Sequence, residues 1–219
     1  MNIKGAIFDM DGTLLNSMVF WDTFWELMGN KYCGGNKFKP TAKEEEQMRT
    51  MTNYEVCTYL HKVYKMGESP EDVQAACAGA LVDFYANKVQ PKPGAIEYIE
   101  YLSSKNIPMC VASGTASDLL ELVLKRFDIR KYFGNIFSCV DLGAGKEKPD
   151  IYEAALAYLG TPKDETWVFE DASIAIHTAT ELGLNTVGIY DAENAFQDKI
   201  RNEATLYIGE GETLMKLAD

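Results

Sequence analysis

The stretch IKGAIFDMDGT, Ile3–Thr13, decides the fold, because in it an apolar run ends in two aspartates and a glycine. Ile3–Phe8 is typical of a short buried strand, since it is a brief apolar run that leads directly into a turn signal. Asp9 and Asp11 follow at the carboxyl end of this strand, where open α/β sheets bind their ligands. Gly12 allows the backbone to leave in a tight turn. The stretch therefore predicts a sheet with a polar site at a strand end.

Beyond this stretch, apolar runs typical of strands alternate with segments of helical periodicity. The expected strands are Pro108–Ala112, Ile136–Val140, Trp167–Phe169, Thr186–Ile189 and Ala204–Ile208. The expected helices are Gly94–Lys105, Ser117–Phe127, Pro149–Leu159, Ile174–Leu182 and Glu212–Leu217. This alternation predicts an α/β fold in which helices cover both faces of a mostly parallel sheet.

Residues 16–89 differ in character from the rest of the chain, because they are rich in Glu, Lys, Tyr and Met and contain no convincing strand. Apolar residues at helical spacing over Val56–Tyr64 indicate one helix, and Ser69 is a typical N-cap for a second. We therefore expect a helical cap, residues 16–89, inserted into an α/β core made of residues 1–15 and 90–219.

The chain is acidic, with 33 acidic against 21 basic residues and a formal net charge of −12 over 219 residues. This charge disfavours binding to nucleic acid or to an anionic membrane surface, and it favours a small-molecule partner. The five cysteines lie singly, without a CxxC pair, and suggest neither a disulfide framework nor a zinc site. We see no signal-peptide or membrane-span pattern and expect a cytoplasmic protein. The sequence leaves the oligomeric state open.

The acid pair Asp9 and Asp11 suits covalent catalysis on a phosphate ester. One carboxylate attacks phosphorus, and the second gives a proton to the leaving oxygen and later takes one from water. The same DxDG pattern is also common in solvated turns. Calcium loops use it as well, but the further ligands expected over the following residues are missing.

Two further segments place phosphate-binding groups after expected strands. Ser113 and Gly114 precede a helix, where a hydroxyl and backbone N–H groups can hold phosphate oxygens, although a turn or an N-cap explains Ser113 equally well. Lys146 lies in a loop ahead of a helix, where its charge can neutralise a phosphoryl group. Lys148 competes for this role, and a solvated loop lysine is the alternative.

A second acid pair, Glu170 and Asp171, follows the expected strand Trp167–Phe169. Adjacent acids suggest a site for a hard cation, and magnesium prefers one or two carboxylates with waters and substrate phosphate. Asp9, the main-chain carbonyl of Asp11, and Asp171 with Glu170 behind it would suffice to hold Mg²⁺. The alternative role for Asp171 is to cap the helix that follows.

The ordered set of acid pair, hydroxyl, lysine and acid pair resembles the haloacid dehalogenase superfamily of hydrolases, in particular its β-phosphoglucomutase-like and phosphatase members with a helical cap. The likeness covers essentially the whole chain outside the cap. It implies a flavodoxin-like (Rossmann-like) sheet, with Asp9 as the nucleophile and Asp11 as the general acid and base. It also implies two groups of binding residues: Ser113, Gly114 and Lys146 for the phosphoryl group, and Asp9, Asp11, Glu170 and Asp171 for magnesium.

Two motifs depart from the family's pattern. Gly145–Asp150 is GKEKPD where the family usually has GKPxPD, so that Glu147 replaces the first proline and the lysine is kept. Glu170–Ala175 is EDASIA where EDSxxG is common, so that a serine and a glycine are absent. The second change leaves the acids in place and concerns the entry of the following helix.

The resemblance also separates several activities. Dehalogenating members lack the second aspartate, so Asp11 argues for phosphate-ester chemistry. Sugar phosphomutases of this type tend to carry a histidine early in the cap, where this chain has Phe20, Trp21 and Trp25. We therefore expect a phosphatase that acts on small phosphorylated metabolites. A sugar phosphomutase and a non-enzymatic phosphometabolite-binding or interaction protein are the alternatives, and the sequence does not name the substrate.

Overall fold

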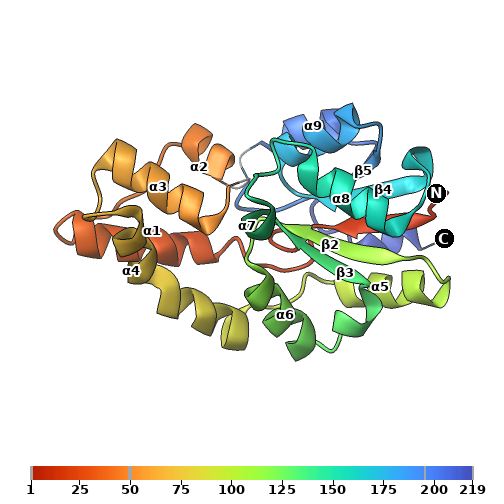
Figure 1. Cartoon of the computed structure of the whole chain (residues 1–219), viewed down its shortest axis with the longest axis horizontal. Coiled ribbons are helices and arrows are strands. Elements are labelled where there is room, and N and C mark those ends of the chain that lie inside the picture. The colour runs from red at the N-terminus through yellow and green to blue at the C-terminus, as the bar shows by residue number, and fades with distance from the viewer. Residues whose placement is uncertain (1, 49–50, 195, 219) are drawn as a thin grey trace.

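One parallel sheet forms the centre of the molecule. The computed structural model describes residues 2–48, 51–194 and 196–218. Within them six strands pair in the order β3-β2-β1-β4-β5-β6, all parallel (Figure 1). The strands are β1 Gly5–Phe8, β2 Met109–Ser113, β3 Asn135–Ser138, β4 Thr166–Glu170, β5 Asn185–Ile189 and β6 Leu206–Ile208. The strand order runs in opposite directions on the two sides of β1, and this switch point is where such sheets bind ligands.

The register of the sheet aligns the strand ends that carry the predicted site residues. Phe8, the last residue of β1, pairs with Val111 of β2 and with Phe169 of β4. Asp9 therefore leaves the sheet at the same edge as Ser113 and Glu170, because parallel strands all end on one side.

Helices cover both faces of the sheet (Figure 1). Alternate residues of β1 point to opposite faces, so that Phe8 packs with α5 (Ala95–Ser104) and α6 (Ser117–Arg126). Ile7 packs on the other face, and its helical partners there are α8 (Asp150–Leu159) and α9 (Ser173–Glu181). The remaining elements on this part of the chain are α7 (Cys139–Leu142), α10 (Gln197–Glu203) and the 3₁₀ turns η2 (Arg130–Tyr132), η3 (Lys163–Glu165) and η4 (Leu214–Leu217).

Between β1 and β2 the chain forms a helical insertion at one end of the sheet (Figure 1). Its helices are α1 (Phe20–Tyr32), α2 (Ala42–Met48), α3 (Asn53–Tyr64) and α4 (Pro70–Asp83), and a one-turn π-helix, η1 (Phe84–Lys88), follows. A separate apolar cluster, which includes Phe24, Met28 and Leu60, holds these helices together. Thr52 forms a capping box with Glu55 at the start of α3, and Ser69 caps α4 as the sequence predicted.

The two ends of the insertion lie side by side. Leu15 and Pro91 form an isolated antiparallel bridge. The backbone N–H of Asn16 donates to the Gln90 carbonyl at 2.8 Å, and that of Lys92 donates to the Leu14 carbonyl at 2.8 Å. The chain thus enters and leaves the insertion through paired backbone segments.

Most of the expected elements match within a residue or two, two of them differ in extent, and several helices had no expected range of their own. The run Ile136–Val140 is a strand only as far as Ser138, because its last residues begin the short helix α7. Glu212–Leu217 forms a 3₁₀ turn over Leu214–Leu217 only. Helix α10 was not expected, since its sequence QDKIRNE carries one buried apolar residue, Ile200.

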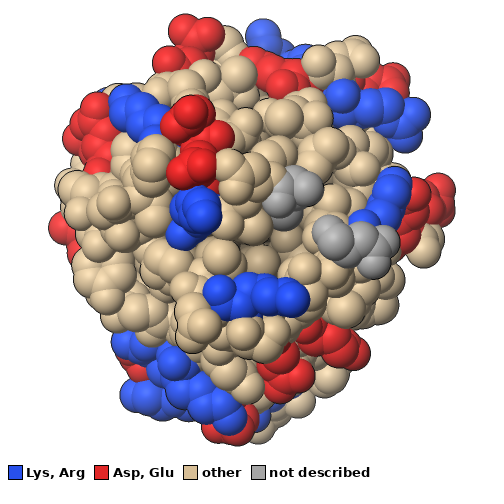
Figure 2. Space-filling model, turned by 90° about the vertical axis from the view of Figure 1, so that its right-hand side faces the viewer, with Lys and Arg blue, Asp and Glu red and all other residues tan. Residues whose placement is uncertain are grey.

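The distribution of surface charge and the length of the helices are relevant to binding of nucleic acid and of membranes. Acidic and basic side chains are interspersed over the face of the sheet domain that lies opposite the insertion (Figure 2). Among the helices of the described residues, none has the length and apolarity needed to span a lipid bilayer.

Candidate active site

Asp9 and Asp11 lie beside the second acid pair at the carboxyl edge of the sheet. The Asp9 side chain is buried, with 5% exposure, and Asp11 is half-buried. Gly12 directly follows Asp11 in the chain, and its φ is +84°, a backbone conformation that glycine adopts without strain. A Cβ at Gly12 would also clash with the carboxylate of Asp171. Glycine is therefore needed at this position both for the turn and for the close approach of the two acidic segments.

Lys146 supplies a buried cation to this acidic site. Its side chain is 4% exposed, and its Nζ lies 2.5 Å from Oδ1 of Asp9 and also contacts Oε1 of Glu170. Burial raises the pKa of Asp9 well above its usual range, a shift that Lys146 opposes and Glu170 reinforces. Burial alone would lower the pKa of Lys146, but Asp9 and Glu170 together raise it well above its usual range. Lys146 is thus a charged lysine shared by two carboxylates.

Of the two lysines that competed in the sequence, only Lys146 reaches the acid pair, since Lys148 is exposed. The two positions belong to one loop between α7 and α8. Hydrophobic pattern does not separate them, because both are lysines in a polar segment, so that only the path of the loop decides which one is buried.

Glu170, the last residue of β4, and Asp171 after it have different hydrogen-bond partners. Glu170 is 1% exposed, and its Oε2 accepts the backbone N–H groups of Asp171 at 3.0 Å and Ala172 at 3.1 Å. The N-cap of α9 is Ala172, so the helix-capping alternative for Asp171 is not what the structure shows. Instead, Asp171 accepts a hydrogen bond from the Thr13 hydroxyl at 3.5 Å on its Oδ1. The Asn194 amide donates to the main-chain carbonyl of Asp171 at 2.6 Å.

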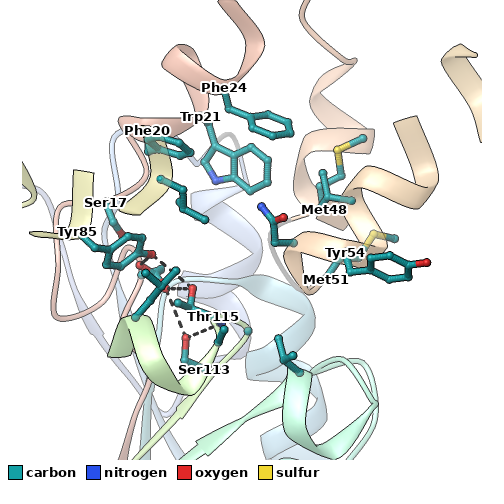
Figure 3. Close-up of a pocket in the computed structure, with 18 of the residues that line it drawn as sticks. Ser17, Phe20, Trp21, Phe24, Met48, Met51, Tyr54, Tyr85, Ser113 and Thr115 are labelled. Carbon is teal, nitrogen blue, oxygen red and sulfur yellow. Dashed lines mark hydrogen bonds between the residues drawn. The ribbon is translucent and has the colours of Figure 1, made fainter. Parts of the chain in front are cut away.

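The end of β2 and the loop after it bring the hydroxyl groups of Ser113 and Thr115 to the site (Figure 3). Thr115 donates its hydroxyl to Oδ2 of Asp11 at 2.7 Å, and the Ser113 hydroxyl lies 3.4 Å from the same oxygen. Ser113 is fully buried, and its Oγ accepts the Thr115 backbone N–H at 3.1 Å. Helix α6 starts with Ala116 at its N-cap, so Ser113, at the end of β2, and Gly114, in the bend that follows, do not cap the helix. Both residues line the cavity beside Asp11.

A residue that the sequence analysis missed completes this group. Tyr85, from the π-helix η1, donates its hydroxyl to Oδ1 of Asp11 at 2.5 Å, and its Oη lies 3.4 Å from Oγ1 of Thr115. Burial, followed by the Asp11 charge, raises the pKa of the Tyr85 phenol well above its usual range, so that it is a hydrogen-bond donor at neutral pH. The sequence gives no signal for it, because Tyr85 is one aromatic among several in the insertion.

Comparison with known proteins identifies the family to which these site residues belong. The sequence pattern of the haloacid dehalogenase-like hydrolases matches residues 6–189, which is most of the chain and includes every predicted site residue. The chain belongs to this family.

Several relatives of this haloacid dehalogenase-like protein are phosphatases by name. The chain is 28% identical over 198 residues to a (DL)-glycerol-3-phosphatase of Arabidopsis thaliana, with 87% of this chain and 80% of that protein covered. It is 23% identical over 186 residues to a phosphorylated carbohydrates phosphatase of Thermotoga maritima, with 84% of each covered. Its fold is similar to that of β-phosphoglucomutase from Clostridium difficile, with a TM-score of 0.72, 19% identity and coverage of 94% and 91%.

The acidic groups of this haloacid dehalogenase-like site fit a metal ion. Asp9, Glu170 and Asp171 are buried, and each offers an oxygen within 4.8 Å of the others. Oδ2 of Asp9 has no hydrogen-bond partner among the described residues. Three buried carboxylates face the single charge of Lys146 at this point, and such clusters are stabilised by a hard cation. Because both oxygens of Glu170 already accept hydrogen bonds, Asp9 and Asp171 are the better placed acids to face it.

A cavity of about 480 Å³ opens above these residues, between the sheet and the insertion. The insertion contributes a wall of apolar side chains that includes Phe20, Trp21 and Phe24 of α1 (Figure 3). Phe24 is buried in the helical cluster, whereas Phe20 and Trp21 are half-buried. These aromatic side chains therefore combine packing within the insertion with contact to the cavity.

Proposed function

We propose that the protein is a magnesium-dependent phosphatase that hydrolyses small phosphorylated metabolites through a phosphoryl intermediate on Asp9. The observation that carries this proposal is the convergence, at one sheet edge, of a buried carboxylate paired with Lys146 and a second carboxylate held by hydroxyl groups. The names of the related phosphatases support the reaction class.

In the proposed first step, an oxygen of Asp9 forms a bond to phosphorus while the bond from phosphorus to the ester oxygen breaks. Asp11 gives its proton to that departing oxygen, which leaves as the free alcohol. In the second step a water oxygen bonds to phosphorus, its proton goes to Asp11, and the bond between phosphorus and Asp9 breaks. Phosphate is released and both aspartates return to their starting states.

Lys146, Ser113 and the backbone N–H of Gly114 would bind the oxygens of the phosphoryl group during both steps. The Nζ of Lys146 is already in contact with Asp9, so its charge lies next to the atom that takes up the phosphoryl group. Mg²⁺ would be held by Asp9, Asp171 and the main-chain carbonyl of Asp11, with Glu170 behind them. The ion would supply positive charge that offsets repulsion between the carboxylates and the anionic substrate.

We further propose that residues 16–89 act as a cap over a core of residues 1–15 and 90–219. The cavity lies between these two parts, and its apolar wall comes from the insertion. The organic part of the ester would contact that wall while the phosphate lies against the sheet edge. Closure of such a layer excludes water during the first step.

A sugar phosphomutase is the second candidate, and the similarity in fold to a β-phosphoglucomutase supports it. Hydrolysis is favoured because Phe20 and Trp21 line the cavity at the early part of the insertion, where mutases of this type tend to have a histidine. A non-enzymatic phosphometabolite-binding protein would not need both acids of the first motif.

The deciding experiment measures phosphate release from a panel of sugar phosphates, phosphoglycolate, nucleotides and pyrophosphate. It compares the native chain with Asp9→Asn, with magnesium and with a chelator. We expect magnesium-dependent release that falls by at least about a thousandfold in the variant. Release that persists in Asp9→Asn would exclude the proposed intermediate. Transfer of phosphate within a sugar phosphate, without release, would establish the mutase.

A further inference from the structure

The π-helix η1 is the feature from which this inference starts. In an α-helix, the N–H of Val89 would bond to the carbonyl of Tyr85, four residues earlier. Here it bonds to the Phe84 carbonyl at 2.9 Å, which is the five-residue spacing of a π-helix. The extra residue rotates the side chains of this turn relative to those of α4. Single π turns of this kind are frequent at functional sites.

Arg126 of α6 fixes this turn to the sheet domain. Its Nη1 donates to the Tyr85 carbonyl at 2.6 Å, which is the carbonyl that the Val89 N–H does not reach. Its other terminal nitrogen, Nη2, donates to the carbonyl of Val89. Tyr85 and Val89 belong to the apolar cluster of the sheet rather than to that of the insertion. The Tyr85 ring is therefore anchored to the same rigid part of the molecule as Asp11.

Because Tyr85 is anchored in this way, its hydroxyl fixes the orientation of the Asp11 carboxyl group. Oδ1 of Asp11 accepts from Tyr85, whereas Oδ2 lies beside the hydroxyls of Thr115 and Ser113. A carboxyl group rotates freely unless its oxygens are held separately. With Oδ1 held by Tyr85, Oδ2 is the oxygen that faces the Ser113 end of the site, where the phosphoryl group would bind.

We infer that Tyr85 is a positioning residue for the proposed acid–base group, because it holds one oxygen of Asp11 so that the other faces the ester. This inference rests on the proposed phosphatase function. Tyr85 takes no part in bond making: the proton still passes from Asp11 to the ester oxygen as the bond from phosphorus to that oxygen breaks. Arg126 supports the arrangement through the backbone of the π turn.

The leaving group provides the test, because only some esters need the proton. p-Nitrophenolate leaves as a stable anion, whereas the alkoxide of benzyl phosphate must be protonated as it leaves. The two esters are similar in size, so that cavity contacts are nearly matched. In Tyr85→Phe we expect kcat/KM for benzyl phosphate to fall by about tenfold to a hundredfold, and kcat/KM for p-nitrophenyl phosphate to change by less than about threefold. The ratio kcat/KM is the quantity compared throughout this test, because it reports the step in which the ester bond breaks and not the second step, which both esters share.

Tyr98→Phe is the matched control. Tyr98 is fully buried in the same apolar cluster, its hydroxyl has no hydrogen-bond partner in the described residues, and it does not line the cavity. This variant should leave both esters within about twofold of the native rate. Circular dichroism and the melting temperature of each variant establish that the fold is intact.

A double variant shows whether Tyr85 acts through Asp11. If it does, Tyr85→Phe should change the benzyl phosphate rate of Asp11→Asn by less than about twofold, because the group that it positions is already lost. Equal loss for both esters in folded Tyr85→Phe, no loss for either, or fully additive effects in the double variant would overturn the inference. If the native chain releases phosphate from neither ester nor from the metabolite panel, the phosphatase proposal itself fails, and this inference fails with it.

Discussion

The sheet and the helical insertion face the same cavity with opposite kinds of surface. The sheet side presents polar side chains from strand ends and from the loop before α8, and Asp9, Glu170 and Lys146 are each at most 5% exposed. The insertion presents half-buried rings such as Phe20 and Trp21, which belong to a cluster of their own. The difference teaches that, under the proposed function, the reacting groups lie at the sheet edge, whereas contacts to the organic part of a substrate come from a separately packed layer. Substitutions at Asp9, at Lys146 or at the metal-binding acids should therefore affect every ester, and those in the apolar wall of the insertion should affect some esters only.

Metal removal should have the largest effect, and it should be equal for all esters. A chelator is expected to abolish phosphate release, and added Mg²⁺ should restore it, because the buried carboxylates lack sufficient positive charge without the ion. The melting temperature gives an independent measurement: Mg²⁺ should raise it in the native protein and raise it less in Asp171→Asn. Turnover that is insensitive to the chelator would contradict the metal assignment.

Lys146→Met should lower kcat for all esters by about a hundredfold to a thousandfold, because the charge next to Asp9 is lost. It should also reduce the free energy of unfolding by about 3 kcal/mol in the absence of metal, since two buried carboxylates lose their partner. Steady-state kinetics and urea unfolding measure the two effects. Lys148→Met is the control and should be near native in both, since Lys148 is exposed. The reverse pattern would assign the role to Lys148.

Trp21→Ala should distinguish the role of the insertion from that of the sheet directly. Trp21 lines the cavity and stacks on Trp25, with ring centroids 5.1 Å apart. We expect kcat/KM to fall by about tenfold for esters with a bulky organic group and to change little for the smallest ones. Phe38→Ala removes a ring from the same cluster but away from the cavity, and it should not alter this selectivity. Equal loss for large and small esters would show that the insertion acts on the chemistry itself.

Glu44→Gln should have the smallest effect, and one confined to the insertion. Glu44 accepts hydrogen bonds from Thr41, Tyr59 and Tyr64 and so joins α2 to α3. Hydrogen bonds from the side chain and the backbone of Thr41, and then from the tyrosines, lower the pKa of Glu44 to about 2. At neutral pH we expect the variant to lose about 1 kcal/mol of stability, with kcat unchanged.

The pH dependence of this stability difference follows from the lowered pKa. Because Glu44 binds a proton more readily in the unfolded chain, its contribution is complete above its unfolded pKa and disappears as the pH falls toward about 2. Urea unfolding of the native protein and of Glu44→Gln between pH 2 and pH 7 should therefore converge at the acid end. Glu26→Gln, at an exposed position of α1, is the control. A constant difference over this range would rule out the proposed linkage.

The sequence predicted the part of the site that depends on strand ends. Parallel strands must finish on one edge, so a polar residue directly after each apolar run could be placed without knowing any contact, as Asp9 and Glu170 illustrate. The choice between Lys146 and Lys148 could not be made in this way, because it depends on the path of a loop.

The features that escaped prediction depend on tertiary contacts. The π turn that carries Tyr85 is held by Arg126, which is 41 residues away in sequence. Nothing in the local pattern distinguishes this tyrosine from its neighbours. Helix α10 escaped for a related reason, since only Ile200 anchors it in the core. Local periodicity carries information about the face that an element buries, and it carries none about a hydrogen bond made across the fold.

The paired backbones at Leu15 and Pro91 have a consequence for how the molecule can change. Because the two ends of the insertion are hydrogen-bonded to each other there, the chain leaves the sheet and returns to it at adjacent points. The distance between these points does not depend on how many residues the insertion contains. The entropy of closing the insertion grows only slowly with its length. A differently sized helical block, grafted between the same two positions, would leave the strand ends where they are. The paired segments at Leu15 and Pro91 thus allow the same sheet edge to be combined with helical insertions of different size and lining.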